Sequence, residues 1–155
     1  MKVRPYESND LTQIKTIILS LHPQWFDKNA LNNIPIDVVL GKTFVVAENV
    51  AVQGFIVISS LEGVVWINWL GVDPKRHGQG IGTKLLTHAE DELKKIGVSE
   101  LRVDTVVEQS PADGTYDKTI QFYLKNNFVI FEKKEQQKHK EFIYKRGILK
   151  KDLLK

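Results

Sequence analysis

Three glycines within five residues are the feature of this chain whose type and spacing point most directly to chemistry. They are Gly78, Gly80 and Gly82, and they lie between an apolar stretch and an amphipathic helical pattern. Glycine has no Cβ, so its backbone takes left-handed angles and approaches a ligand closely. A glycine turn that opens a helix directs several unpaired N–H groups to one point, where the helix dipole is also positive. The run therefore predicts a seat for phosphate that requires no metal.

Two other phosphate motifs and one structural explanation compete with this interpretation. A P-loop requires Gly-x-x-x-x-Gly-Lys-Ser/Thr, which this sequence does not contain. The dinucleotide fingerprint fits poorly, because Thr83 stands where a third small residue belongs and residues 73–77 separate the glycines from the preceding strand. Asp104 after the next strand imitates the ribose-binding acid of that fingerprint. A dinucleotide site therefore stays open as an alternative, as does a glycine turn that binds no ligand.

The size and composition bound the remaining possibilities. The chain has 155 residues, 42% hydrophobic and 26% charged, which predicts one soluble domain over residues 1–155 with 147–155 as a C-terminal tail. It has no cysteine, so disulfides, thiolate metal sites and a cysteine nucleophile are excluded, and we expect no metal. The N-terminus carries no apolar leader, and no window approaches the roughly 18 apolar residues of a spanning helix. We therefore expect a cytoplasmic protein without a membrane partner.

The net charge is +3, and much of the excess lies in the C-terminal third. A basic end of this kind suits nucleic acid or a solvated surface. Acids interrupt the patch, which favours the solvated surface and predicts no nucleic-acid partner. The basic residues are Lys133, Lys134, Lys138, Lys140, Lys145, Arg146, Lys150, Lys151 and Lys155, and the interrupting acids are Glu132, Glu135, Glu141 and Asp152.

The apolar periodicity predicts the elements that must position the glycine run. A helix is expected over residues 11–21 with a capping box of Asp10 and Gln13, followed by a weaker helix over 28–40 that breaks around Pro35. The predicted strands are a short one near Val3, an antiparallel meander of 43–48, 53–59 and 64–72, a strand over 99–107 and a closing hairpin of 128–133 and 140–146.

The second half of the chain predicts a crossover. A strand, a helix over 81–96 ended by Gly97, and another strand imply a locally parallel strand pair. A loop is expected over 110–114, then a helix over 115–126 capped by Asp113 or Thr115. The last residues, 148–154, predict a short amphipathic turn that packs on the domain or on a second subunit, the latter making a homodimer.

The stretch from Leu70 to Leu86 resembles the acyl-CoA-binding motif of the GCN5-related N-acetyltransferase (GNAT) superfamily, Gln/Arg-x-x-Gly-x-Gly/Ala. His77 takes the place usually held by Gln or Arg. A second stretch, Phe122 to Phe128, resembles the family's Phe-Tyr-x-Lys-x-Gly-Phe segment, with Asn127 in place of glycine. The resemblance covers roughly residues 1–146 and implies an α+β, three-layer fold: a mixed, mostly antiparallel central sheet with a splayed parallel strand pair and helices on both faces.

The resemblance implies acetyl-CoA as the donor and a primary amine of a small molecule or peptide as the acceptor. The diphosphate is expected on the backbone N–H groups of residues 78–83, and the pantetheine arm beside the strand that leads into the turn. A catalytically inactive acyl-CoA-binding or sensing module is the alternative function. The expected cofactor-binding residues are Leu70, Gly71, Val72, His77, Gly78, Gln79, Gly80, Ile81, Gly82, Thr83 and Lys125.

Two catalytic residues are expected. Tyr123 matches the family tyrosine that gives a proton to the departing sulfur, because a phenol is protonated at neutral pH. The general base that would deprotonate the amine is less determined, because the strand before the turn carries no acid. Glu108 is the chosen candidate, and Asp104 or a water held by Asn68 are the alternatives. The aromatic loop at 22–26 and the pair Trp66 and Trp69 line an acceptor pocket or pack in the core.

Overall fold

The computed structural model describes residues 1–110, 115–139 and 142–154, with 115 and 116 described by their backbone alone. The expected loop at 110–114 and the cap from Asp113 therefore fall outside the described residues, except for Ser110, which ends a strand. The elements are β1 (Lys2–Pro5), the 3₁₀ turn η1 (Ser8–Asp10), α1 (Leu11–Leu21), α2 (Lys28–Leu40), β2 (Lys42–Glu48), β3 (Ala51–Leu61), β4 (Val64–Val72), the 3₁₀ turn η2 (Pro74–Arg76), α3 (Ile81–Lys95), β5 (Glu100–Ser110), α4 (Thr115–Lys125), β6 (Val129–His139) and β7 (Phe142–Asp152).

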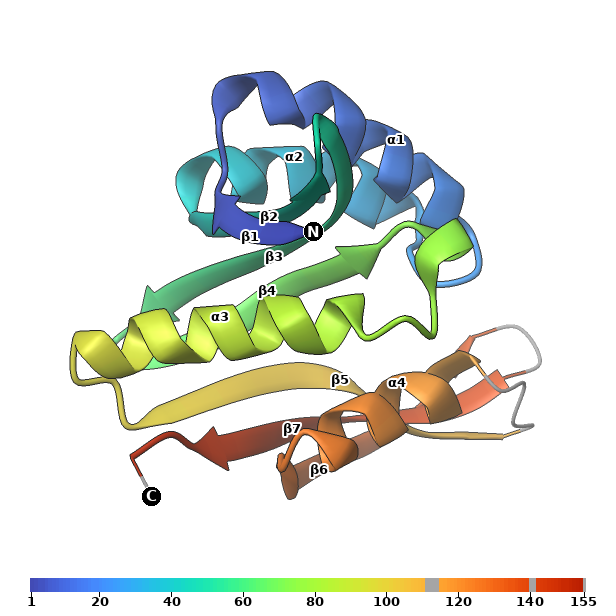
Figure 1. Ribbon diagram of the computed structural model, residues 1–155. Helices are drawn as coiled ribbons and strands as arrows, with labels where there is room; N and C mark the ends of the chain where they lie inside the picture. Colours follow the sequence, from blue (N-terminus) through green and yellow to red (C-terminus); the bar gives the residue numbers. More distant parts are fainter. Residues whose placement is uncertain (111–114, 140–141, 155) are drawn as a thin grey trace.

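The seven strands form one sheet in the order β1-β2-β3-β4-β5-β7-β6 (Figure 1). Strands β2, β3 and β4 make the predicted antiparallel meander. Its two turns hold Asn49, Glu62 and Gly63 at φ values of 55°, 52° and 82°. Strands β4 and β5, joined through α3, are parallel, and the other neighbouring strands pair antiparallel. The mixed, mostly antiparallel sheet with one parallel pair confirms the predicted fold class.

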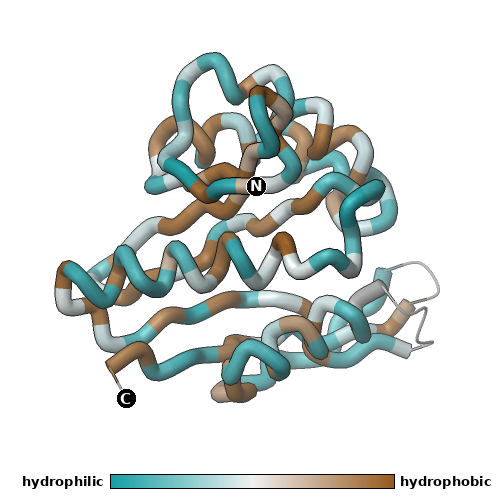
Figure 2. Tube along the Cα trace, in the orientation of Figure 1, coloured by the Kyte–Doolittle hydropathy of each residue, from teal (hydrophilic) through white to brown (hydrophobic). Residues whose placement is uncertain are grey.

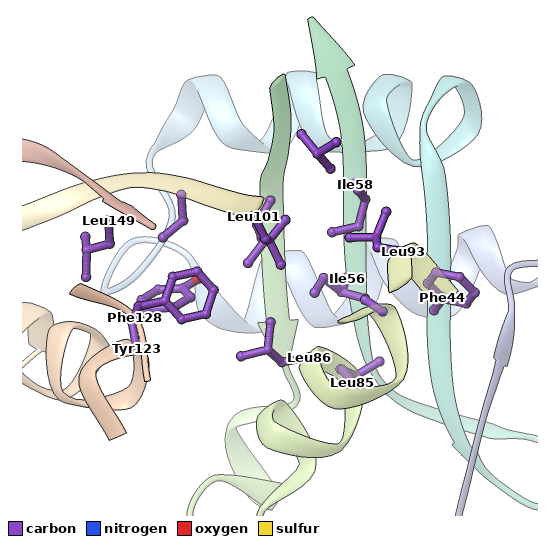
Figure 3. Packing of buried hydrophobic residues seen from close by; sticks show 14 of the residues in the cluster. Phe44, Ile56, Ile58, Leu85, Leu86, Leu93, Leu101, Tyr123, Phe128 and Leu149 are labelled. Atoms are coloured by element: carbon purple, nitrogen blue, oxygen red, sulfur yellow. The ribbon is translucent and has the colours of Figure 1, made fainter. Parts of the chain in front are cut away.

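Helices cover both faces of the sheet and enclose two cores. Helices α1 and α2 pack on one face through Ile14, Ile18 and Ile34, against Phe55 of β3. Helices α3 and α4 lie on the opposite face, where the apolar side of α3 turns toward the strands and its polar side outward (Figures 1 and 2). Figure 3 shows this second core, in which residues from five strands gather around α3 and the end of α4.

The predicted capping box of Asp10 and Gln13 is wrong. Asp10 already has helical angles, φ −75° and ψ −20°, because the turn η1 precedes α1. Its buried carboxylate instead accepts hydrogen bonds from Arg4 at 2.8 and 2.9 Å and from the backbone N–H of Glu7 at 2.8 Å. Gln13 reaches across to the β2–β3 turn, where it bonds the backbone at 3.0 and 2.9 Å. Both side chains therefore form contacts that the spacing of residues in the sequence does not reveal.

The predicted break at Pro35 is also wrong, because α2 continues through this residue. Proline removes one backbone donor inside a helix and usually kinks or ends it. Its neighbours Ile34 and Val38 are buried against the sheet, and Asp27 caps the helix by accepting from the N–H of Ala30 at 2.9 Å. We attribute the continuity of α2 to this burial and this cap.

The C-terminal turn expected at 148–154 is a strand for most of its length. The closing hairpin is longer than predicted, and β7 runs to Asp152 between β5 and β6. Leu149 and Leu153 are buried in the core, and Lys151 reaches Glu90 of α3 at 2.9 Å. Pairing with β5 and burial in the core therefore engage these residues within the domain.

Strands β4 and β5 pair only near their starts. The parallel ladder ends with Ile67 opposite Val103. Asn68 follows as an extra residue, because the pairing of β4 with β3 steps from Ile67 directly to Trp69. A bulge bends a strand and increases its local twist. The bulge thus accompanies the separation of β4 from β5 and leaves residues 68–72 without a strand partner on that side.

Candidate active site

A cleft of about 1290 Å³ opens where β4 and β5 separate. Its walls come from the loop between α1 and α2, the end of β4, the glycine turn, β5 and α4, together with Arg146 of β7. These segments are far apart in sequence and meet here because the bulge at Asn68 spreads the two strands. The predicted phosphate seat therefore opens onto a concave site of ligand size.

The glycine turn has the geometry that its residue types predict. Gly78 and Gly80 have φ values of 79° and 78°, and Gly80 is the N-cap of α3. A Cβ added at either position meets no heavy atom within 4 Å, so the backbone angle requires glycine and the space beside the turn is open. Gly82 differs, because a Cβ there would lie 3.0 Å from the ring of Phe122. This third glycine allows α3 and α4 to approach each other.

His77 links the turn to the strand that precedes it. Its Nε2 lies 2.9 Å from the carbonyl oxygen of Val72, and since a carbonyl only accepts, Nε2 carries the proton. The imidazole also meets the indole of Trp25 edge to face, with centroids 5.0 Å apart. The donor side of the cleft and its aromatic wall are therefore in direct contact.

Most of the expected cofactor residues come together at the cleft. Three of them, Gly71, Gln79 and Lys125, lie outside its lining. Gly71 is needed for packing instead, because a Cβ there would be 2.7 Å from the ring of Phe55. Lys125 is exposed at the end of α4. The residues that line the cleft are Leu70, Val72, His77, Gly78, Gly80, Ile81, Gly82 and Thr83.

Tyr123 lies between the core and the cleft. Its ring meets Phe122 and Phe128 edge to face at 5.2 and 5.3 Å, and Figure 3 shows it against Phe128. The residue is 5% exposed and also lines the cleft. Burial raises the pKa of the phenol above its usual value, so the hydroxyl keeps its proton throughout the neutral range. Both interpretations of Tyr123, core packing and proton donation, are compatible with this position.

The structure does not bring Glu108 to Tyr123. Glu108 is exposed on β5 after a bulge and is not among the described residues that line the cleft. Its carboxylate pairs with Lys133 at 2.5 Å and with Lys145 at 3.7 Å. The hydrogen bond from Lys133 and the two positive charges hold the pKa of Glu108 below its usual range, which makes it a weak base.

The two other base candidates do line the cleft. Asp104 accepts from Lys134 at 2.5 Å through Oδ2 and from Nε of Arg146 at 3.0 Å through Oδ1. Asn68, the bulge residue, is exposed in the cleft wall. Asp104 is therefore engaged by two cations, whereas the amide of Asn68 faces solvent and is free to hold a water.

An aromatic wall forms another part of the cleft lining. It comprises Trp25, Phe26, Trp66 and Trp69, all of which line the cleft. The rings of Phe26 and Trp69 meet at 85° with centroids 5.7 Å apart. Residues 24–26 of the aromatic loop and the tryptophan pair thus line the cleft, while Trp25, Phe26 and Trp69 also pack on the core.

Sequence reasoning missed three residues of this region. Asp37 of α2 accepts a hydrogen bond from the indole N–H of Trp69 at 2.7 Å. Lys118 and Arg146 add two cations to the cleft lining. None of them belongs to a local motif, so no signal in the sequence alone identifies them.

The described part of the chain shows no other kind of functional cluster. Across residues 1–110, 115–139 and 142–154, no three side chains gather in a way suited to a metal ion. No helix within these ranges has the length and apolar content to span a bilayer. Several of the basic residues near the C-terminus pair with acids, for example Lys133 with Glu108 and Lys151 with Glu90, which fits the expected solvated surface.

Comparison with known proteins agrees with this geometry. The sequence matches the acetyltransferase (GNAT) family over residues 14–122. Comparison with curated proteins gave no match. Similar solved structures include the ribosomal-protein-S18-alanine N-acetyltransferase from Escherichia coli, with 21% identity, a TM-score of 0.75 and coverage of 98% of this chain and 93% of that one.

Two further solved structures share the fold. The yncA putative acetyltransferase from Salmonella typhimurium, solved with its cofactor acetyl-CoA, has 19% identity and a TM-score of 0.75, over 100% of this chain and 95% of that one. The aminoglycoside 6'-N-acetyltransferase from Enterococcus faecium has 14% identity and a TM-score of 0.78, over 100% and 98% of the two chains. At these identities the likeness establishes the fold.

Proposed function

Because the chain belongs to the GNAT family of acetyltransferases, we propose that it is an enzyme that transfers an acetyl group from acetyl-CoA to a primary amine of a small molecule or peptide. The observation that carries this proposal is the meeting of three features in one cleft. They are an unpaired strand edge, a glycine turn at a helix start and a buried tyrosine. Each of them matches one chemical need of acetyl transfer. The strand edge would polarise the carbonyl of the donor, the glycine turn would hold its diphosphate and the tyrosine would protonate the leaving sulfur.

The glycine turn would hold the diphosphate of the donor. The N–H groups at the start of α3 have no partner within the helix, and the helix dipole is positive there. Gly78 and Gly80 keep the space beside these groups open. Thr83 adds a hydroxyl to the lining. This arrangement supplies directed hydrogen bonds to phosphate oxygens without a metal.

The free edge of β4 would align the acyl arm. Residues 68–72 have no strand partner on the side of β5, so the backbone groups that point to this side, apart from the Val72 carbonyl bonded to His77, are available to an extended ligand. Backbone N–H groups near Leu70 and Val72 would polarise the thioester carbonyl, as an oxyanion site does. The hydrogen bond from His77 to the Val72 carbonyl fixes the end of this edge.

Tyr123 and solvent would manage the protons. The neutral amine attacks the carbonyl carbon, the C–N bond forms and the C–S bond breaks. Tyr123 gives its proton to the sulfur, a role for which burial suits it because burial keeps the phenol protonated. The proton of the attacking nitrogen passes to water beside Asn68, and Tyr123 recovers its own proton from solvent.

One observation favours the second candidate, an acyl-CoA-binding module without catalysis. The expected base Glu108 stands outside the described lining of the cleft and pairs with two lysines. Incubation of acetyl-CoA with a panel of amines, followed by mass spectrometry, separates the two functions. Acetylated product supports the enzyme, whereas tight donor binding without any product supports the module.

A pair of glycine variants tests the donor seat. Gly80 and Gly97 both have a positive φ, 78° and 85°, and both have nothing within 4 Å of an added Cβ, but only Gly80 borders the cleft. Alanine at either position therefore carries a similar backbone strain of about 1–2 kcal/mol. We expect calorimetry to show at least a tenfold loss of coenzyme A affinity for Gly80→Ala and less than a twofold change for Gly97→Ala. Equal affinities in the two folded variants would contradict the proposal.

A further inference from the structure

Both acids among the described residues that line the cleft already have partners. The acids that line it are Asp27 and Asp104. Asp27 caps α2 by accepting from the backbone N–H of Ala30 at 2.9 Å. Both oxygens of Asp104 accept from cations, one from Lys134 and one from Arg146. The exposed Asp27 keeps its second oxygen, but it stands at the N-terminus of α2, where the helix dipole favours the charged carboxylate over the protonated one. Both acids are therefore poor acceptors for the proton of an incoming ammonium group.

An amine that enters such a cleft has to arrive neutral. The reference pKa of a lysine ε-amine is about 10.4 and that of a peptide α-amine about 7.8. At pH 7 about one α-amine in seven is neutral, against roughly one ε-amine in 2,500. The difference, of several hundredfold, is large enough to decide which amine reacts where the protein supplies no base.

The aromatic wall indicates what lies next to that amine. Phe26 and Trp69 form a ring pair, and Trp25 stands beside them against His77. The polar edge of Trp69 is already satisfied, because its N–H donates to Asp37 at 2.7 Å. The part of the wall formed by Phe26 and Trp69 therefore offers ring carbon rather than hydrogen-bonding groups, which suits an apolar or aromatic side chain.

The charges of the cleft argue against a polycationic acceptor. Lys118 and Arg146 line it, and Lys134 stands beside it on Asp104. With Arg76, which also lines the cleft, these four cations outnumber the acids Asp27 and Asp104. A second ammonium group on the acceptor would meet a net repulsion from these cations, whereas an acid further along a peptide would meet a favourable field.

We propose that the acceptor is the α-amine at the N-terminus of a peptide whose first side chain is apolar or aromatic. This inference rests on the proposed acetyl transfer and narrows its acceptor. The neutral α-amine forms the C–N bond, coenzyme A leaves with the proton of Tyr123, and the excess proton of the nitrogen passes to water. The geometry disfavours ε-amines, polyamines and aminoglycosides.

Matched peptides test the choice of amine. One carries Phe at a free N-terminus and an ε-acetylated lysine, and the other carries the same residues with the N-terminus acetylated and the lysine free. We expect kcat/KM at pH 7 to be about a hundredfold higher for the free N-terminus. We also expect it to level off above pH 8 for the α-amine, but to keep rising toward pH 10 for the ε-amine. Equal values at pH 7, or faster acetylation of spermidine or of free phenylalanine, would overturn the proposal.

A tryptophan variant tests the wall independently of the amine. We expect Trp25→Ala to raise KM at least tenfold for the Phe peptide and less than threefold for the same peptide beginning with Gly. Phe131→Ala is the matched control, because Phe131 is exposed on β6 and outside the described lining. Equal changes for both peptides would overturn the assignment of the wall.

Coenzyme A titration of the same preparations separates the possible failures. Donor binding with acetylation only of ε-amines or polyamines overturns this inference and leaves the proposed enzyme standing. Donor binding without acetylation of any amine overturns both and supports the binding module. Loss of donor binding in the wild-type protein overturns the proposed function at its first step.

Discussion

Trp69 donates its indole N–H to Oδ2 of Asp37 at 2.7 Å, which ties the residue after the β4 bulge to the last turn of helix α2. The two positions are 32 residues apart in the sequence. The same ring meets Phe26 of the α1–α2 loop edge to face. Asp37 does not line the cleft, so any effect on substrate has to act through Trp69. Asp37 is thus a positioning residue for the aromatic wall.

We expect Asp37→Leu to raise the KM of the acceptor five- to tenfold and to leave coenzyme A affinity within twofold. Loss of the acceptor atom leaves the Trp69 N–H unpaired, at a cost to stability of about 1–2 kcal/mol. Asp37→Asn keeps an amide oxygen at the same place and is expected to restore most of the acceptor affinity. A parallel loss of donor and acceptor affinity in both variants would show that Asp37 supports the fold as a whole.

We expect Tyr123→Phe to lower kcat by about 10²–10⁴-fold, the usual contribution of a positioned proton donor. The ring contacts with Phe122 and Phe128 are kept, so coenzyme A affinity should stay within threefold. Because burial raises the pKa of Tyr123, kcat of the wild type should show no basic limb below pH 10. Tyr144→Phe, outside the described lining of the cleft, is the matched control. Unchanged kcat in Tyr123→Phe would remove the tyrosine from the mechanism.

The sheet could be predicted from the sequence to the extent that its signals are local. The bounds expected for the third meander strand, 64–72, agree with β4, because a turn and the glycine run flank it. The strand at 148–152 was missed, because Leu149 is buried while Lys150 and Lys151 reach acids on β5 and α3. In the sequence, the apolar pair Ile148-Leu149 followed by the basic pair Lys150-Lys151 resembles one turn of an amphipathic helix. Only contacts with residues distant in the sequence show that this segment is a strand.

The part of the site that could be predicted from the sequence is the part where the backbone conformation requires a particular residue type. Gly78 and Gly80 require left-handed angles, and this need is visible in the sequence itself. The resemblance to a family supplied Tyr123. The acid Glu108 was misleading, because no local pattern shows that Lys133 and Lys145 would pair with it. Partners of charged side chains depend on strand register, which the sequence does not reveal.

We expect the stability of the protein to fall below about pH 4, where unfolded aspartate begins to take up protons. Asp10 is buried, and the hydrogen bonds from Arg4 and from the Glu7 backbone hold its pKa below its usual range. A carboxyl group with a lowered pKa stabilises the fold above its unfolded pKa and loses that contribution as the pH falls through its folded pKa. Asp10→Asn should therefore be about 1–3 kcal/mol less stable than the wild type at pH 7. Urea titrations should show this gap closing toward pH 2, and a gap that does not depend on pH would contradict the assignment.

Gly82 and Phe122 form a pair whose coupling can be measured. A Cβ at position 82 would lie 3.0 Å from the Phe122 ring, tighter than an ordinary contact, although alanine is favoured over glycine in a helix by about 1 kcal/mol. Phe122 also packs against Tyr123, so a displaced ring would disturb the proton donor. We expect Gly82→Ala to lower kcat about tenfold with little net change in stability. Phe122→Leu removes the ring, so adding Gly82→Ala to it should raise stability by about 1 kcal/mol without a further loss of kcat. Additive effects on kcat would mean that Gly82 acts on the donor alone, and not through the approach of α3 to α4.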